Sequence, residues 1–122
     1  MKVDKADKAF SLFVRERAGW KCERCGVQYF PPTTGLQCSH FFGRGNESTR
    51  FDPENASAHC MKCHFYFTAN PHEHSNWVKK KLGPERYAAL VVRWRTFHKK
   101  DREKSYRDVK ALYDDLKRYV RD

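Results

Sequence analysis

Four of the five cysteines form two Cys-x-x-Cys pairs, Cys22 with Cys25 and Cys60 with Cys63. In each pair a tight turn can present two thiolates to one cation, and four thiolates complete the tetrahedral set of a structural zinc site. A disulfide or a redox dithiol does not explain the second pair, and no redox-type strand–helix–strand pattern accompanies them. The spacing therefore predicts a structural Zn²⁺ site. Cys38 is left over, and because it follows an apolar residue it is interpreted as a buried, reduced thiol.

Three polar residues stand in the order His40, Asn55, His64, the last directly after a predicted zinc ligand. A neutral imidazole near its pKa is suited to act as a general base, and His40 is the candidate. Hydrolysis of a phosphodiester also needs a cation beside the charged phosphorane, and His64 is the best candidate ligand. Arg44 lies between two glycines, where it is suited to grip a phosphate oxygen. These residue types favour phosphodiester chemistry.

The same residues carry a resemblance to a known family. The segments CERC, SHFFGR, RFDPEN and CMKCH, in this order, resemble the HNH, or ββα-metal, nucleases, and within them most of all the phage recombination nucleases NinG and Rap. The two zinc pairs also resemble those of phage endonuclease VII, a Holliday-junction resolvase. The match covers roughly residues 20–70. It implies a β-hairpin and a helix around one divalent cation, and a metal-dependent DNA endonuclease, with branched DNA as its substrate in phage or prophage recombination.

The resemblance also implies a role for each residue. His40 would deprotonate a water, Mg²⁺ or Mn²⁺ on His64 would stabilise the leaving oxygen, and Asn55 would hold the strand of His40 through backbone hydrogen bonds. Arg44 would contact the phosphate. The products would carry 5′-phosphate and 3′-hydroxyl ends.

One position departs from the family pattern. Many HNH enzymes carry Asp, Glu or His just before the catalytic histidine, as a second metal ligand, and this chain has Ser39. A hydroxyl is a poor ligand for a hard divalent cation, so the missing ligand is expected from water, from His59, or from the cluster His72, Glu73 and His74. A non-catalytic zinc-knuckle module that binds nucleic acid, with an inactive HNH fold, therefore stays open as the alternative.

The charge is concentrated near the C-terminus. The net charge is +10, and residues 79–122 hold 15 lysines and arginines against 7 acidic residues, whereas residues 1–78 hold 10 against 8. A basic tract beside a Cys/His-rich half indicates a polyanion as partner, nucleic acid first. A basic but merely solvated helix face is the alternative. The expected DNA contacts are Arg44, Arg50, Lys79, Lys80, Lys81, Arg93, Arg95, Lys99 and Lys100. For Arg50 an ion pair with Asp52 is equally open.

The helices and strands expected to position these residues indicate a small α+β fold. We expect a zinc-stapled core over residues 1–74, with an N-terminal helix, and a basic helical extension over 75–122 that packs on it. Helical spacing and breakers place these elements. The expected helices are 4–18, one from His64 interrupted at 70–74, then 75–82, 85–99 and 103–121; the expected strands are 36–42 and one near 56–58.

The setting is expected to be the cytoplasm, that of the host cell if the chain is phage-encoded. No apolar run approaches membrane-spanning length, and the N-terminal segment MKVDKADKAF has no apolar signal-peptide core. Thiols stay reduced in that compartment, which favours metal over disulfide. A homodimer stays open, because the apolar stripe from Tyr106 to Tyr119 can pack on its own chain or on a second copy.

Overall fold

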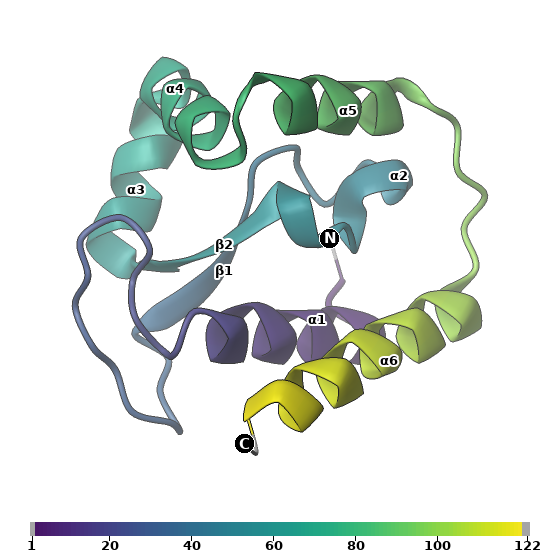
Figure 1. Ribbon diagram of the computed structural model, residues 1–122, viewed down its shortest axis with the longest axis horizontal. Helices are drawn as coiled ribbons and strands as arrows, with labels where there is room; N and C mark the ends of the chain where they lie inside the picture. The colour runs from purple at the N-terminus through teal and green to yellow at the C-terminus, as the bar shows by residue number, and fades with distance from the viewer. Residues whose placement is uncertain (1, 121–122) are drawn as a thin grey trace.

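The structure is a computed structural model that describes residues 2–120, and it combines helices with one small sheet, as the sequence predicts. The elements follow the chain from the N-terminal α1 to the C-terminal α6 (Figure 1). They are α1 (Lys5–Arg17), β1 (Leu36–His40), α2 (Glu47–Arg50), a 3-10 turn (Pro53–Asn55), β2 (Ala56–Cys60), α3 (Met61–Ala69), α4 (Pro71–Leu82), α5 (Pro84–Arg95) and α6 (Arg102–Val120).

Helix α1 begins where local chemistry dictates. The Asp4 side chain accepts a hydrogen bond from the Asp7 backbone N–H at 3.0 Å, and the Asp7 side chain accepts one from the Asp4 N–H at 3.0 Å. This capping box satisfies two N–H groups that an open helix end leaves without partners. After the helix, Gly19 and Trp20 both adopt positive φ, and the chain turns into the first cysteine pair. The helix thus starts and stops as its sequence predicts.

The sheet brings the two halves of the candidate site together. Strands β1 and β2 are antiparallel, with Leu36 opposite Cys60 and His40 opposite Ala56. Strand β1 ends at His40, two residues earlier than predicted, and β2 extends to Cys60. Helix α3 follows β2 without a connecting loop. The second cysteine pair therefore spans the junction of β2 and α3.

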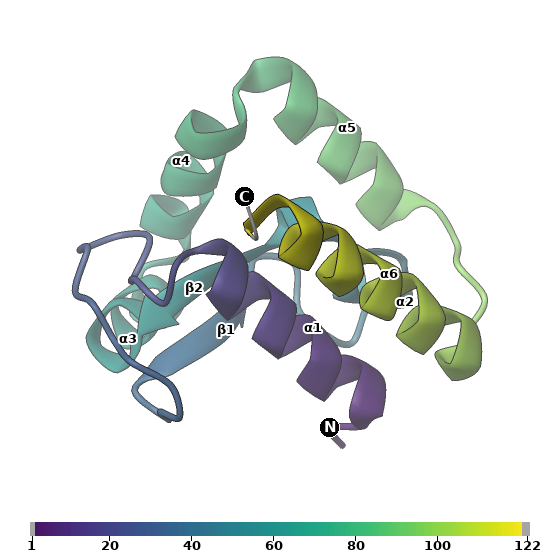
Figure 2. The same cartoon turned by 60° about the horizontal axis from the view of Figure 1, so that its bottom comes forward.

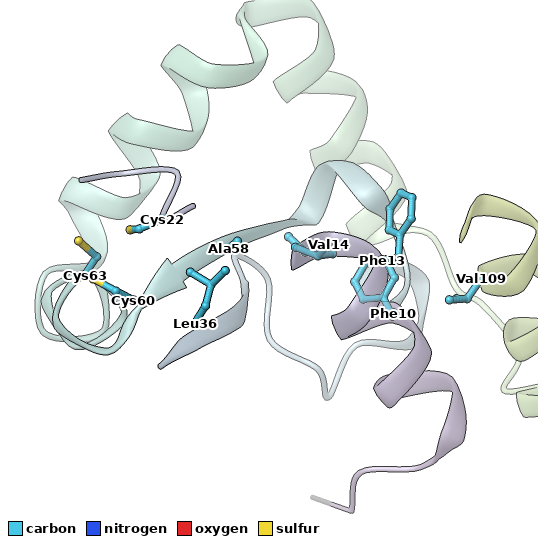
Figure 3. Packing of buried hydrophobic residues seen from close by; sticks show 10 residues of the cluster. Phe10, Phe13, Val14, Cys22, Leu36, Ala58, Cys60, Cys63 and Val109 are labelled. Atoms are coloured by element: carbon cyan, nitrogen blue, oxygen red, sulfur yellow. The ribbon is translucent and has the colours of Figure 1, made fainter. Parts of the chain in front are cut away.

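The main core lies between the sheet, α1 and α6. Figure 3 shows Leu36 and Ala58 of the sheet facing Phe10 and Val14 of α1, with Val109 of α6 on the far side of α1. Each of these side chains is at most 1% exposed. Burial of large apolar side chains of this kind contributes about 1.5–3 kcal/mol each. The C-terminal helix is therefore part of the same core as the sheet, and Figure 2 shows it lying alongside α1.

The helices after the sheet differ from expectation at their ends. Helix α4 begins at Pro71 rather than at Ser75, because proline is well suited to the first helical position, where no N–H is needed. Gly83, with φ 81°, separates α4 from α5 at the predicted break. Helix α5 ends at Arg95, so residues 96–101 are irregular instead of helical. The predicted final helix agrees with α6, although its last residue, 121, lies outside the described residues.

A second apolar cluster supports the α4–α5 corner. Val78, Leu82 and Leu90 are buried there, with Phe41, Phe42, Trp77 and Tyr87 packed around them. Phe42 stacks on Trp94 of α5, with ring centroids 4.2 Å apart and planes 4° apart. The loop after β1 is thereby attached to α5. None of the helices within residues 2–120 is both long and apolar enough to cross a membrane.

Candidate metal centre and active-site hollow

The two cysteine pairs converge on one point. The four sulfur atoms of Cys22, Cys25, Cys60 and Cys63 all lie within 4.8 Å of one another, and the Cys25 and Cys60 sulfurs are 3.7 Å apart. A tetrahedral zinc ion with Zn–S bonds of 2.3 Å separates its sulfurs by about 3.8 Å. The cluster is therefore compatible with a structural zinc site, as predicted. Figure 3 shows Cys22, Cys60 and Cys63 gathered at the end of the sheet away from α6.

Hydrogen bonds extend this cluster into the sheet. The Glu23 N–H donates to the Ala58 carbonyl at 2.8 Å, and the Ala58 N–H donates to the Glu23 carboxylate at 2.7 Å. Both backbone groups of Ala58 therefore point away from β1. Opposite residues in an antiparallel pair exchange both hydrogen bonds or neither, so Cys38, opposite Ala58, directs its own N–H and C=O to the outer edge of β1.

A hollow of about 560 Å³ runs along that outer edge. Figure 2 shows β1 between α3 and α1, and residues of both helices, of β1 and of the loop after it line the hollow. Its lining includes three residues that the sequence singled out, His40, Arg44 and His64. We call this space the β1 hollow; its complete lining is Val3, Asp7, Lys8, Ser11, Arg15, Gln37, Cys38, His40, Arg44 and His64.

His40 stands at the end of β1 with a defined tautomer. Its Nε2 lies 2.9 Å from the Arg50 carbonyl oxygen. Since a carbonyl only accepts, Nε2 carries the proton and Nδ1 keeps the lone pair. Nδ1 has no hydrogen-bond partner within residues 2–120 and is not among the buried unpartnered atoms, so solvent reaches it. Burial, with the nearby Arg44 charge, holds the pKa of His40 below its usual value, which keeps the ring neutral at pH 7.

Asn55 ties the loop that follows β1. It is 1% exposed, and its side-chain oxygen accepts from the Phe42 N–H at 2.8 Å. Its side-chain nitrogen donates to the Phe42 carbonyl at 2.8 Å and to the Thr49 carbonyl at 3.0 Å. These three hydrogen bonds close the loop over residues 42–49. The end of β1 that carries His40 is thereby held in place.

The two arginines of this loop lie in different environments. Arg44 is half-buried and lines the β1 hollow. Arg50 is 4% exposed and donates to both carboxylate oxygens of Asp7, at 2.8 and 2.5 Å. This placement removes Arg50 from the expected DNA surface, and its ion partner is Asp7 of α1 rather than the adjacent Asp52. The pairing fixes the carbonyl that accepts from His40.

The metal-ligating candidates beyond the cysteines are more dispersed. His64 lines the hollow, and its Nδ1 is buried with no partner. Ser39 is 3% exposed and does not line the hollow. His59 is fully buried, with neither ring nitrogen hydrogen-bonded, and packs against His74, whose ring centroid is 6.0 Å away. Within residues 2–120 the four cysteines form the only group of three or more His, Cys, Asp or Glu side chains that could hold a metal ion together.

His59 and His74 are neutral at pH 7. Burial first, and then repulsion from the Lys81 charge and from His74 when that ring is protonated, lower the pKa of His59 to about 3. Burial likewise lowers the pKa of His74 to about 4. His72 and Glu73, the other members of the cluster considered for the missing ligand, are exposed on α4.

The basic residues expected on DNA divide into two groups. Lys81 contacts the Glu23 carboxylate at 2.9 Å, and Arg93 contacts those of Asp52 and Glu54 at 2.6 and 2.9 Å. These two cations are engaged within the protein, because each connects its helix to a segment near the sheet. The remaining expected contacts are exposed: Lys79, Lys80, Arg95, Lys99 and Lys100.

One wall of the hollow was missed from the sequence. Lys8, Ser11 and Arg15 line it from α1. They recur at three- and four-residue spacing on the polar side of a helix whose other side is apolar, which is the signal that identifies a shared face. That signal predicts which residues share a face of α1, but it does not predict that β1 lies beside this face. The contribution of α1 to the hollow could therefore be identified only from the structure.

No family model, curated protein or solved structure matches this chain. Functional assignment therefore depends on the residues and geometry described above.

Proposed function

We propose that this chain is a metal-dependent DNA endonuclease of HNH type that hydrolyses phosphodiester bonds, with branched DNA of phage recombination as its substrate. The observation that carries the proposal is the lining of the β1 hollow. A candidate base, His40, a candidate phosphate ligand, Arg44, and a candidate metal ligand, His64, come from three segments and share one open space. The zinc-compatible cluster sits at the start of α3, where it fixes the helix that carries His64.

The geometry of His40 supports the role of general base. His40 lines the hollow, and its Nδ1, which carries the lone pair, is open to solvent, so it can take a proton from water as the water oxygen attacks phosphorus. The bond from phosphorus to the 3′ oxygen then breaks, leaving a 5′-phosphate and a 3′-hydroxyl. Arg44 and Cys38 line the same hollow, and in this proposal the Arg44 guanidinium and the outward N–H of Cys38 donate hydrogen bonds to phosphate oxygens.

The residues that line the hollow can supply one protein ligand, His64, to a divalent cation. The buried Nδ1 of His64 has no partner, and such an atom points to an ion or water that completes it. A Mg²⁺ or Mn²⁺ ion bound there would neutralise charge on the phosphorane and stabilise the leaving oxygen. The remaining ligand positions would be filled by water and phosphate oxygens, as is usual for these hard cations.

A nicking assay tests the proposal. Zinc-loaded protein is incubated with supercoiled plasmid and with branched DNA in the presence of Mg²⁺ or Mn²⁺, beside the His40→Ala variant. We expect the wild type to cut with either metal and the variant to bind but not cut. The nicks should be sealed by a ligase, because they carry a 5′-phosphate. If the wild type and His40→Ala both bind DNA and neither cuts it, the endonuclease proposal is rejected.

That outcome would favour the second candidate, a non-catalytic zinc-knuckle module that binds nucleic acid. One observation supports it: Ser39, which stands at the position of the family's second metal ligand, is buried away from the hollow. Such a module uses the cysteine cluster and the exposed cations but needs neither His40 nor His64.

A further inference from the structure

Among the described side chains, the most exposed aromatic one lies in the irregular segment between α5 and α6. Phe97 is 89% exposed. The segment is held at both ends, because the Thr96 hydroxyl donates to the Val92 carbonyl at 2.7 Å and the Asp101 side chain accepts from the Lys104 N–H at 3.1 Å. Phe97 is thus displayed from an anchored segment. Figures 1 and 2 show this segment at the opposite end of the molecule from α3.

Cations flank this phenylalanine in the sequence. Arg95, Lys99 and Lys100 are all exposed. No carboxylate within residues 2–120 forms an ion pair with Arg95, Lys99 or Lys100. An exposed aromatic ring among unpaired cations matches the chemistry of a nucleic acid strand, whose phosphates pair with the cations while a base stacks on the ring. A protein partner with an apolar patch would gain nothing from these charges.

One loop contributes to both the β1 hollow and the surroundings of Phe97. Arg44 lines the β1 hollow, and the next two residues, Gly45 and Asn46, line a second hollow together with Phe97. The Asn46 side chain donates to the Trp94 carbonyl at 3.3 Å, and the Ser48 hydroxyl donates to the same oxygen at 3.0 Å. The loop that carries Arg44 is therefore fixed against the end of α5, next to Phe97.

We propose that Phe97 is a stacking platform for an unpaired DNA base, and that the protein selects DNA with unpaired bases next to the bond at His40. This inference rests on the proposed function for its substrate and adds what the site recognises. In fully paired duplex the base faces are already stacked on one another, so Phe97 has no free face to contact. A single strand or a branch offers such a face, and base–aromatic stacking is insensitive to sequence.

Binding measurements in a His40→Ala background, where no cutting interferes, test the inference. Fluorescence anisotropy compares a single-stranded oligonucleotide with a duplex of the same sequence. We expect Phe97→Ala to weaken single-strand binding by about 5- to 150-fold and duplex binding by less than about twofold. Phe97→Trp should keep the wild-type preference. Phe30→Ala is the matched control, because Phe30 is a 78% exposed phenylalanine without flanking cations and should change neither affinity.

Photocrosslinking locates the contact directly. Single-stranded DNA that carries 5-iodouracil should crosslink to the tryptic peptide Thr96–Lys99, and Phe97→Ala should abolish that product. Equal losses on single strand and duplex, no loss with Phe97→Ala, or a crosslink elsewhere would overturn the inference. If the wild type does not cut but the single-strand preference still depends on Phe97, the stacking role of Phe97 stands, and the hydrolysis at His40 in the proposed function fails.

Discussion

Replacing Asp7 with asparagine tests whether Arg50 is a structural cation or a DNA contact. The side chains of Arg50 and Asp7 are 4% and 5% exposed, so the ion pair is removed from water. Arg50 also donates to the carbonyls of Arg44 and Lys2 at 3.2 and 3.3 Å. The asparagine keeps the shape and the capping oxygen of Asp7 but removes the charge that Arg50 needs.

We expect Asp7→Asn to lower the free energy of unfolding substantially. Removing one partner of a buried ion pair leaves an uncompensated charge and destabilises a protein by about 3–5 kcal/mol. For a chain of this size that lowers Tm by about 12–20 °C. Burial is the largest single influence on the pKa of Asp7 and raises it, but the hydrogen bonds from Arg50 and from the Asp4 N–H, together with the Arg50 and Arg44 charges, outweigh burial, and the pKa lies below its usual value. The stabilisation is therefore present at neutral pH and is lost as the pH falls through that lowered pKa, so the cost of Asp7→Asn should shrink in acid.

Urea unfolding of zinc-loaded protein, followed by circular dichroism at pH 7, measures this cost. The double variant Asp7→Leu, Arg50→Met is the matched control, because an apolar pair of similar volume should be less destabilised than either Asp7→Asn or Arg50→Met alone. A loss below about 1 kcal/mol for Asp7→Asn, with Arg50→Met weakening DNA binding at unchanged stability, would refute the structural role of Arg50.

Three further perturbations have expected outcomes. Metal analysis should find one zinc per chain, and its release by a mercurial reagent should lower Tm, because thiolate–zinc binding stabilises the folded state; a zinc-free protein of equal stability would contradict this. The cleavage rate should rise with pH to a plateau reached below the usual titration range of histidine, because burial lowers the pKa of His40. Arg44→Ala should move this rise to higher pH, because it removes a positive charge that lowers the same pKa. A shift to lower pH would show that the Arg44 charge does not act on His40. The alanine variants of Lys79 and Lys80 should each reduce the salt slope of DNA binding by about 1, whereas Lys81→Ala should chiefly lower stability because Lys81 pairs with Glu23; the largest slope change at Lys81 would reverse this assignment.

Features with local causes were predictable from the sequence. The cysteine cluster follows from two short spacings, and the start of α1 and the break at Gly83 follow from capping and backbone rules. Asn55 was expected to hydrogen-bond backbone across its loop, and its three side-chain bonds do so. In each case the residues that determine the feature are close in sequence or belong to a strict pattern.

Features with distant causes were not predictable. Arg50 pairs with Asp7, 43 residues earlier, and the choice between this partner and the adjacent Asp52 depends on how α1 packs against the loop. The sequence predicts an interruption over residues 70–74, whereas Pro71 is the first residue of α4, where the packing of α4 against α3 continues the helical region. The burial of His59 also required the packing of α3 and α4 over the sheet.

Single-turnover cleavage by the wild type and the His40→Ala variant, at equal DNA occupancy and with Mg²⁺ or Mn²⁺, is the most direct test of the central claim. His98→Ala serves as the control, because His98 is an exposed histidine that does not line the β1 hollow. The account predicts that His40→Ala slows cleavage by about 10²- to 10⁴-fold while His98→Ala leaves the rate unchanged. Equal rates for the wild type and His40→Ala would contradict it.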